Sequence, residues 1–416
     1  MLNRRFPVLV ASKRYSPEFQ SDPQYAKSWK AVLEKAYGTH AVCQCPSSGD
    51  RKLSIKRRED SDGFHLARFA GTGHEHSNEC RFYAPAPERS GMQGYDVGVV
   101  EEGDDGSIRV RLARGIRVQA ARAEGGESSE EKKSPGKRKP AMTLLGLLHL
   151  LWSEARINAW YPAMEGKRNA GIVNYALLQA AERISASRMK LSDVLLLAAL
   201  KDSKDAARNQ TVAMSAISRD YRLVAVSPLA RYNADRHAGD LLKLPLSGPF
   251  GMPALHLPPA VWATTVKRFE REISAWKRGS RVIAVAQVTP RNGTTVPQAD
   301  VVELALMQVS ERWIPLDSDY EGVIEARLHA AGRSFDKPLR YDADESEVFP
   351  DFWLLDAGKD FPLEVFGMNT PVYLERKAVK TAWYNREYGG DGWWSWNAAS
   401  DPQGKNVPPF PEKTRR

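Results

Sequence analysis

The sequence predicts a mixed α/β protein with more than one domain. Short runs rich in valine, isoleucine and leucine alternate with segments of helical periodicity. A charged stretch at residues 121–140 contains no large apolar side chain and divides the chain. Towards the C-terminus, residues 313–400 read as helix, three strands, helix and strand, an αβββαβ order. A length of 416 residues fits two or three domains of ordinary size.

Composition favours a polyanionic partner over a membrane. Hydrophobic residues make up 42% of the chain and charged residues 27%, which is ordinary for a soluble protein. The formal net charge of +9 makes nucleic acid the first partner class to consider, although proteins that bind none reach this value as well. The apolar run Leu144–Trp152 is too short to cross a bilayer, and the first residues show no secretory pattern. We therefore expect a cytoplasmic protein with no membrane partner.

All three cysteines lie in one N-terminal segment. Cys43 and Cys45 are followed, after a loop of about thirty residues, by His76 and Cys80 in a His-x-x-x-Cys spacing. Three thiolates and one imidazole suit a tetrahedral structural Zn²⁺ site, and these four residues are the predicted ligands. His74 competes with His76 for the fourth place, and His65 is a more distant candidate. The alternative is a set of buried free thiols with solvent-facing histidines.

The N-terminal pattern also resembles that of an uncharacterised bacterial family. That family is described by three cysteines near the N-terminus and is often carried by mobile elements. The matching residues are Cys43-Gln44-Cys45 and the segment 71–83, from Gly-Thr-Gly-His to Cys-Arg-Phe-Tyr. The resemblance spans the full chain. It implies a mobile-element context and supplies no mechanism.

Seven segments follow from these patterns and from the proline, glycine and charge content between them. The predicted units are a zinc-binding module (1–92), a small β segment (93–120), a disordered charged linker (121–141), a helical subdomain (142–220), a mixed α/β layer (221–312), the αβββαβ domain (313–400) and a flexible tail (401–416). In the helical subdomain we expect helices at Met142–Ala155, Val173–Ser185 and Leu191–Leu200. In the layer we expect strands at Leu223–Pro228, Val282–Val288 and Val301–Val309.

Two carboxylates mark the αβββαβ domain. Asp351 follows Pro350 at the start of an apolar strand, and Glu364 lies in the next strand. If residues 357–360 form the hairpin turn, Asp351 lies opposite Phe366, with Glu364 diagonal to it. Side chains alternate with period two, so both acids project from one face within about 7 Å. Such a pair can hold Mg²⁺ or Mn²⁺, with water and phosphate oxygens as the other ligands.

The Pro-Asp, short hairpin and Glu-x-Phe sequence resembles the PD-(D/E)xK nuclease superfamily, which has the restriction-endonuclease-like fold. The resemblance implies that fold and a metal-dependent hydrolysis of phosphodiesters. Phe366 stands where the superfamily pattern has lysine. Several families of this superfamily place a further metal-site acid on the first helix, and Glu321 lies at that position. The same glutamate completes a capping box with Ser318 and shares a helical stripe with Ile324 and Leu328, while Glu325 remains an alternative.

A substitute for the missing lysine is expected from the following helix. Five side chains at i, i+3, i+4, i+7 and i+11 share one face of it: Tyr373, Arg376, Lys377, Lys380 and Tyr384. Lys377 or Lys380 would supply the cation. The opposite stripe, formed by Leu374, Ala378 and Ala382, is expected to pack on the sheet. The alternative is that the polar stripe is only a solvated face.

Two functions from different classes follow. The first is a metal-dependent DNA nuclease of a mobile-element or DNA-processing system, with catalytic Mg²⁺ or Mn²⁺ and a structural zinc module. The second is a catalytically degenerate nuclease fold that acts as a zinc-containing DNA-binding or protein-interaction module. They differ in whether a cation from the second helix reaches the face of Asp351 and Glu364.

Overall fold

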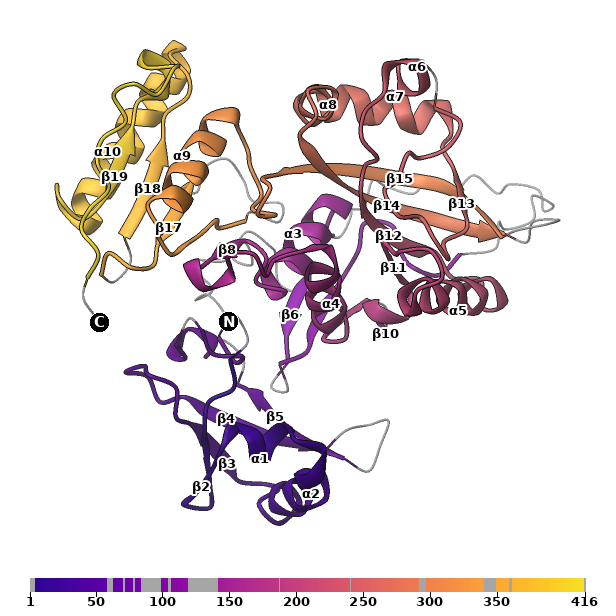
Figure 1. Ribbon diagram of the computed structural model, residues 1–416, viewed down its shortest axis with the longest axis vertical. Helices are drawn as coiled ribbons and strands as arrows, with labels where there is room; N and C mark the ends of the chain where they lie inside the picture. The colour runs from indigo at the N-terminus through magenta and orange to yellow at the C-terminus, as the bar shows by residue number, and fades with distance from the viewer. Residues whose placement is uncertain are drawn as a thin grey trace, which may run out of the picture.

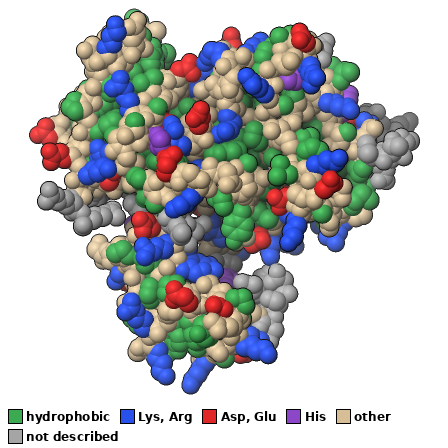
Figure 2. Space-filling view, viewed as in Figure 1, with side chains coloured by type: hydrophobic (Ala, Val, Ile, Leu, Met, Phe, Trp, Pro, Cys, Tyr) green, Lys and Arg blue, Asp and Glu red, His purple; other side chains and the backbone are tan. Residues whose placement is uncertain are grey.

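The computed structural model describes most of the chain in ranges separated by gaps. The described ranges are 4–57, 63–69, 72–77, 79–83, 99–103, 106–118, 141–186, 188–239, 241–291, 297–339, 349–358 and 361–414. The predicted disordered segment 121–140 lies outside them. Three bodies are visible in Figure 1: an N-terminal one at the bottom, a large central one, and a C-terminal one at the upper left. Lysine and arginine side chains are spread over the visible face of all three (Figure 2).

The N-terminal body is a sheet of order β2-β1-β3-β4-β5 in which every neighbouring pair is antiparallel. Its strands are β1 (Val8–Val10), β2 (Lys13–Tyr15), β3 (His40–Cys43), β4 (Lys52–Arg57) and β5 (Phe64–Arg68). Its helices are α1 (Pro17–Ser21), η1 (Pro23–Tyr25), α2 (Ala26–Lys35) and η2 (Gly73–Glu75). Leu33 of α2 packs on Leu53 and Val8 of the sheet in a small core that also contains the three cysteines.

The central body is built on a five-stranded sheet of order β11-β12-β14-β15-β13. The strands are β11 (Leu195–Leu197), β12 (Leu223–Pro228), β13 (Ala254–His256), β14 (Arg281–Arg291) and β15 (Gln298–Val309). A smaller sheet of order β10-β9-β7-β6 lies beside it. Its strands are β6 (Val100–Glu102), β7 (Ile108–Val110), β9 (Ile184–Ala186) and β10 (Met189–Lys190). The three strands predicted for residues 221–312 are present, two of them with longer bounds.

Helices cover the central sheets. They are α3 (Leu144–Glu154), α4 (Ala170–Ala181), η5 (Leu191–Asp193), α5 (Lys204–Ser218), α6 (Ala234–His237), α7 (Pro259–Arg268) and α8 (Glu270–Lys277). The short turn η4 (Pro162–Met164) instead buries Met164 in the core of the C-terminal body. The helix expected at Leu191–Leu200 is absent, because this run forms η5 and then β11, which pairs in parallel with β12. A short, fully buried apolar run has the same pattern in a helix and in a strand, and here the strand is the outcome.

The C-terminal body carries its elements in the order helix, three strands, helix, strand. They are α9 (Asp319–Ala330), β16 (Phe335–Asp336), β17 (Phe352–Leu354), β18 (Phe361–Val365), α10 (Pro371–Tyr388), β19 (Trp394–Trp396) and a final turn η6 (Ala398–Ser400). The sheet order is β19-β18-β17-β16-β8. The edge strand β8 (Ala159–Trp160) comes from the predicted helical subdomain, so that segment completes the C-terminal sheet.

The last residues differ from the loose tail that their proline content predicts. Trp394 donates its indole N–H to the carbonyls of Pro408 and Pro409. The Phe410 ring lies 5.3 Å from the Trp394 ring, and the Thr414 amide donates to the Asp356 carbonyl at 2.9 Å. Proline has no backbone N–H, but its carbonyl can still accept a hydrogen bond, here from the Trp394 indole. These contacts hold residues 408–414 against the C-terminal sheet.

The N-terminal body contacts the rest of the chain through buried arginines. Arg68 of β5 is 2.9 Å from Glu102 of β6 and 3.6 Å from Glu154 of α3. The Arg156 guanidinium lies 4.3 Å from the centre of the Tyr83 ring. Of the helices in the described ranges, none has both the length and the apolar character needed to span a bilayer.

Candidate functional site

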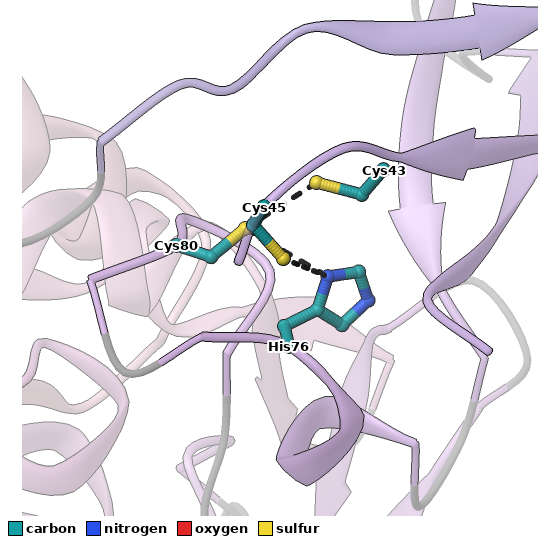
Figure 3. A group of neighbouring side chains, drawn as sticks. All are labelled: Cys43, Cys45, His76 and Cys80. Atoms are coloured by element: carbon teal, nitrogen blue, oxygen red, sulfur yellow. Dashed lines mark hydrogen bonds between the residues drawn. The ribbon is translucent and has the colours of Figure 1, made fainter. Parts of the chain in front are cut away.

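The predicted zinc ligands lie together in the N-terminal body. Cys43 is the last residue of β3, and Cys45 follows two residues later. His76 follows η2, and the backbone of Cys80 forms an isolated parallel β-bridge with Arg4. All four side chains are buried, and their ligand atoms lie within 4.8 Å of one another. In Figure 3 the three sulfur atoms and the imidazole turn towards a common centre. The residues are distant in sequence, so the fold of the sheet brings them together.

The distances within this cluster match a tetrahedral metal site. Zinc bonds of about 2.3 Å to sulfur and about 2.0 Å to nitrogen give tetrahedral edges of about 3.8 Å between sulfurs and about 3.5 Å between sulfur and nitrogen. The Sγ atoms of Cys43 and Cys80 are 3.6 Å apart. His76 Nδ1 is 3.6 Å from Cys45 Sγ and 3.7 Å from Cys80 Sγ. The cluster could therefore hold zinc with little movement.

The surroundings suit a charged metal–thiolate centre. The Ser77 amide donates to Cys45 Sγ at 3.4 Å, and the Phe82 amide donates to Cys80 Sγ at 3.5 Å. Hydrogen bonding with Cys45 raises the pKa of the Cys43 thiol to about 12, while hydrogen bonding with Cys43 and Cys80 lowers the pKa of Cys45. Without a metal, Cys45 is therefore the thiol that ionises most readily, while Cys43 keeps its proton. Since a metal needs all three as thiolates, loading it releases protons.

Two histidines that competed for this site lie elsewhere. His74 is exposed on η2 and is not among the four clustered residues. His65 lies on β5 and is also not among them. His76 turns Nδ1 to the sulfurs and leaves its buried Nε2 without a hydrogen-bond partner in the described residues. The strand and turn geometry therefore brings His76 to the sulfurs in place of His74, which the spacing alone does not reveal.

A second group of buried polar side chains lies in the C-terminal body. Phe352 of β17 pairs with Leu363 of β18, so Asp351 lies directly opposite Glu364. The Asp351 amide donates to the Leu363 carbonyl at 3.0 Å, and its Oδ2 accepts from the Val365 amide at 2.6 Å. The predicted register, with Asp351 opposite Phe366, is wrong by two residues. The hairpin loop is longer than predicted, but a shift of two keeps both acids on one face.

Helix α10 turns its polar stripe towards this pair. Lys380 Nζ is 2.5 Å from Glu364 Oε1, and the Tyr384 hydroxyl donates to Glu364 Oε2 at 2.9 Å. Tyr384 is fully buried. The opposite stripe, which was expected to pack on the sheet, has no buried member; it comprises Leu374, Ala378 and Ala382. The expected orientation of the helix is therefore inverted, because charged hydrogen bonds to a buried glutamate outweigh the burial of small apolar side chains.

Other members of the polar stripe have separate contacts. Lys377 Nζ lies 4.6 Å from the centre of the Phe366 ring, a cation–π contact. The Tyr373 hydroxyl accepts a hydrogen bond from the Gly367 amide at 3.2 Å. Arg376 is exposed. Of the two lysines that could replace the one missing at position 366, Lys380 contacts Glu364 and Lys377 covers Phe366.

A buried lysine that no sequence pattern had indicated lies next to these acids. Lys337 follows β16 with its side chain 3% exposed, and its Nζ is 2.8 Å from Glu321 Oε2 and 2.8 Å from Asp317 Oδ2. Its ammonium also lies 5.6 Å from the centre of the Phe352 ring. Ser318 caps α9 by accepting from the Glu321 amide at 3.1 Å, and the Glu321 carboxylate accepts from the Asp317 amide. Period-two alternation with the buried Phe335 is the signal that could have revealed Lys337.

Burial perturbs the acids of this group, which we call the acid site: Glu321, Lys337, Asp351, Glu364, Lys380 and Tyr384. Burial raises the pKa of Glu321 to about 8, against the opposing charge of Lys337. Burial and the neighbouring Glu364 raise the pKa of Asp351 to about 7. Burial also raises the pKa of Glu364, although Lys380 opposes this. Carboxyl groups with pKa values raised to near neutrality are common in functional sites, where binding of a cation or substrate can displace the proton.

Glu325, the alternative to Glu321 on α9, lies outside the acid site. Its carboxylate accepts from Arg312 at 2.7 and 2.6 Å and from the Ser310 hydroxyl at 3.2 Å. The Glu325 side chain is 1% exposed. It forms a buried ion pair with both oxygens engaged, which fits a structural role.

The raised pKa of Glu321 makes the stability of the C-terminal body depend on pH. The carboxyl holds its proton more tightly in the folded protein, at a pKa of about 8, than in an unfolded chain, at about 4.3. The resulting stabilisation is full below about pH 4 and is lost as pH rises through 8. Urea unfolding followed by tryptophan fluorescence should therefore give a lower midpoint at pH 9 than at pH 6 in metal-free buffer. The Glu321→Gln variant should show a weaker dependence, and an equal slope would contradict the role given to Glu321.

Comparisons with known proteins place this chain in a family without identifying its chemistry. The family described as protein of unknown function (DUF1173) matches residues 15–399. No curated protein and no solved structure matches the chain. The family match agrees with the resemblance to an uncharacterised family over the whole chain. The resemblance to a nuclease superfamily stays a prediction.

Proposed function

The chain belongs to the family described as protein of unknown function (DUF1173), and from its own residues we propose that it is a metal-dependent DNA nuclease of a mobile-element or DNA-processing system. One observation carries the proposal. Lys380 of α10 reaches Glu364 at 2.5 Å, and Asp351 lies opposite Glu364 on the neighbouring strand. Two acids can hold a metal ion that activates water and neutralises phosphate charge, and an ammonium can stabilise the charge that develops on the phosphate. Here the lysine would come from the helix in place of position 366.

The two acids fit a divalent ion of the Mg²⁺ class. Both are hard oxygen donors, and Mg²⁺ is commonly held by one or two carboxylates together with water and substrate phosphate. Asp351 uses Oδ2 for the Val365 amide, so Oδ1 remains for a cation. When bound, such an ion would neutralise phosphate charge and lower the pKa of the attacking water. The proposed metal ligands are Asp351 and Glu364.

The protein residues would hold and orient the reacting groups. Tyr384 fixes Glu364 through its Oε2, which keeps the carboxylate in one rotamer. Lys380 would place its ammonium beside the scissile phosphate and stabilise the charge that develops as water adds and the P–O bond breaks. Glu321, held by Lys337, would keep a further acid beside Asp351 without being a direct ligand. The zinc cluster would act as a structural element of the N-terminal body.

One feature favours the second candidate, a degenerate fold that binds DNA or a protein without cutting. Lys380 and Tyr384 engage both oxygens of Glu364, and Lys377 covers Phe366. A closed network of this kind can be purely structural. The two candidates differ in whether Lys380 leaves Glu364 when a metal and a phosphate arrive.

Cleavage assays with matched variants test the proposal. Zinc-loaded protein, desalted to remove other divalent ions, is incubated with supercoiled plasmid, linear duplex or circular single-stranded DNA, with and without Mg²⁺ or Mn²⁺. Cutting should require the added ion. We expect Asp351→Asn and Glu364→Gln to lower the rate by at least about 10³-fold, and Lys380→Met by about 10²-fold. Lys377→Met, on the same helix, is the control and should stay within about threefold of the wild type.

The outcome distinguishes the two candidates. Equal loss in Lys380→Met and Lys377→Met would contradict the role given to Lys380. A wild-type protein that is folded, contains zinc and cuts none of the substrates would overturn the nuclease proposal. DNA binding by that inert protein would then favour the degenerate fold.

A further inference from the structure

Four aromatic rings form a group on the surface of the N-terminal body, which we call the aromatic surface: Tyr15, Phe19, Tyr25 and Trp29. The Phe19 and Tyr25 rings are stacked with centroids 5.0 Å apart and an interplanar angle of 24°. Tyr15 lies 5.3 Å from Phe19 and 5.6 Å from Trp29. None of the four side chains is fully buried, and Tyr25 is 37% exposed. The Tyr25 ring, stacked on Phe19 by one face, therefore keeps its other face towards solvent.

Cations without acidic partners flank these rings. Lys13, Arg14 and Lys27 are exposed, and none forms an ion pair within the described ranges. By contrast, Lys52 pairs with Asp50 on the same body. Residues 4–57 contain eleven lysines and arginines against four acids, so this body carries a net positive charge. Two of the four acids, Glu18 and Asp22, lie on the elements that carry Phe19 and Tyr25. On the lower body in Figure 2, basic and acidic side chains both border a group of hydrophobic ones.

The hairpin that carries two of these cations is strained. Ala11 and Ser12 connect β1 to β2, and both have positive φ, at 47° and 65°. Two-residue turns of this type favour asparagine and glycine, and a left-handed conformation costs other residues about 1–2 kcal/mol each. The turn starts β2 at Lys13, which lies on the same strand face as Tyr15. Strain of this kind is commonly kept where a local arrangement serves binding.

We propose that the aromatic surface binds single-stranded DNA. A base would stack on the open face of Tyr25, and Lys13 and Lys27 would contact the phosphates. Aromatic rings interleaved with free cations are the combination by which proteins bind unpaired strands, since every base has a face to stack and every linkage a charge to neutralise. The choice of ligand rests on the proposed function, in which the acid site cleaves the strand delivered by this surface.

Binding without cleavage tests the inference. The full-length, zinc-loaded protein is titrated without Mg²⁺ against a fluorescent single-stranded DNA 20-mer, with anisotropy as the readout, in salt from about 50 to 200 mM. We expect Tyr25→Ala to weaken binding by about 5- to 100-fold, the loss of one stacked base. Lys13→Gln with Lys27→Gln should lower the salt dependence by about one to two phosphate contacts. Tyr37→Ala is the matched control, because Tyr37 is 56% exposed on the same body but packs on Phe64 instead.

The results separate this inference from the nuclease proposal. Equal affinity of Tyr25→Ala and Tyr37→Ala would overturn it, and so would a blunt duplex or an RNA 20-mer bound more tightly than the single-stranded DNA. No binding to any nucleic acid would overturn it in favour of a protein partner for this surface. If the protein cuts DNA, Tyr25→Ala should raise KM and leave kcat unchanged; if it does not cut, the binding result still stands or fails by itself.

Discussion

Removing zinc, or replacing Cys80 with serine, is expected to unfold residues 4–83 while the C-terminal body stays folded. The core of the N-terminal body is small, and three of its buried residues are the cysteines themselves. Structural zinc contributes about 10–16 kcal/mol of apparent binding free energy, which is comparable to the whole stability of about 5–15 kcal/mol of an ordinary domain. Without the metal, the sheet loses the tie between the end of β3 and the segment that contains His76.

Three measurements check this result. The wild type should contain one zinc ion per chain, and Cys80→Ser should contain none. Limited proteolysis should then cut the variant within residues 4–83 and spare the acid site. His74→Ala is the control, since His74 is exposed two residues from a ligand and should keep both zinc and protease resistance. A Cys80→Ser protein that resists proteolysis as the wild type does would show that the cluster is no structural zinc site.

Features that depend on residues close together in the sequence were predicted better than contacts between distant elements. The four clustered ligands follow from spacing, because three cysteines cannot all pair as disulfides, whereas thiolates grouped with a histidine are typical zinc ligands. The N-terminal cap of α9 at Ser318 and the strand β12 also follow from neighbouring residues. Each of these depends on interactions within a few residues or on a strong preference of one residue type.

The orientation of α10 could not be derived in the same way. Hydrophobic periodicity assigns the buried face to apolar residues, and α10 buries Tyr384 and directs Lys380 inward instead. The partner that makes this favourable, Glu364, lies on another element. The register between β17 and β18 failed for a related reason, since the length of a hairpin loop is not fixed by the strands that it joins. The contacts that define the acid site therefore join residues that are distant in sequence, such as Lys380 and Glu364.

Replacing Lys337 with methionine is expected to destabilise the C-terminal body by about 3–5 kcal/mol at pH 9, where Glu321 is ionised, because it leaves a buried carboxylate without its partner. Glu321 is 4% exposed and bonded to Lys337, whereas Asp317, the other partner, is 67% exposed in its side chain and can return to water. Urea unfolding monitored by tryptophan fluorescence measures the loss. The double variant Lys337→Met with Glu321→Gln should regain most of it, since the uncompensated charge is removed.

The pH dependence separates a charge effect from lost packing. Glu321 is protonated in the folded protein below its pKa of about 8, so the penalty for losing Lys337 should be smaller at pH 6 than at pH 9. Arg278→Met is the control, because Arg278 pairs with Asp319 of the same helix α9, and this exposed pair should be worth at most about 1 kcal/mol at either pH. A Lys337→Met defect that is independent of pH and is not rescued by Glu321→Gln would mean that contacts of Lys337 other than its ion pair with Glu321 matter more, such as the contact of its ammonium with the Phe352 ring. In that case the acid site would be a packed structural network. The proposal that Glu321 provides a titratable acid beside Asp351 would then lose its support.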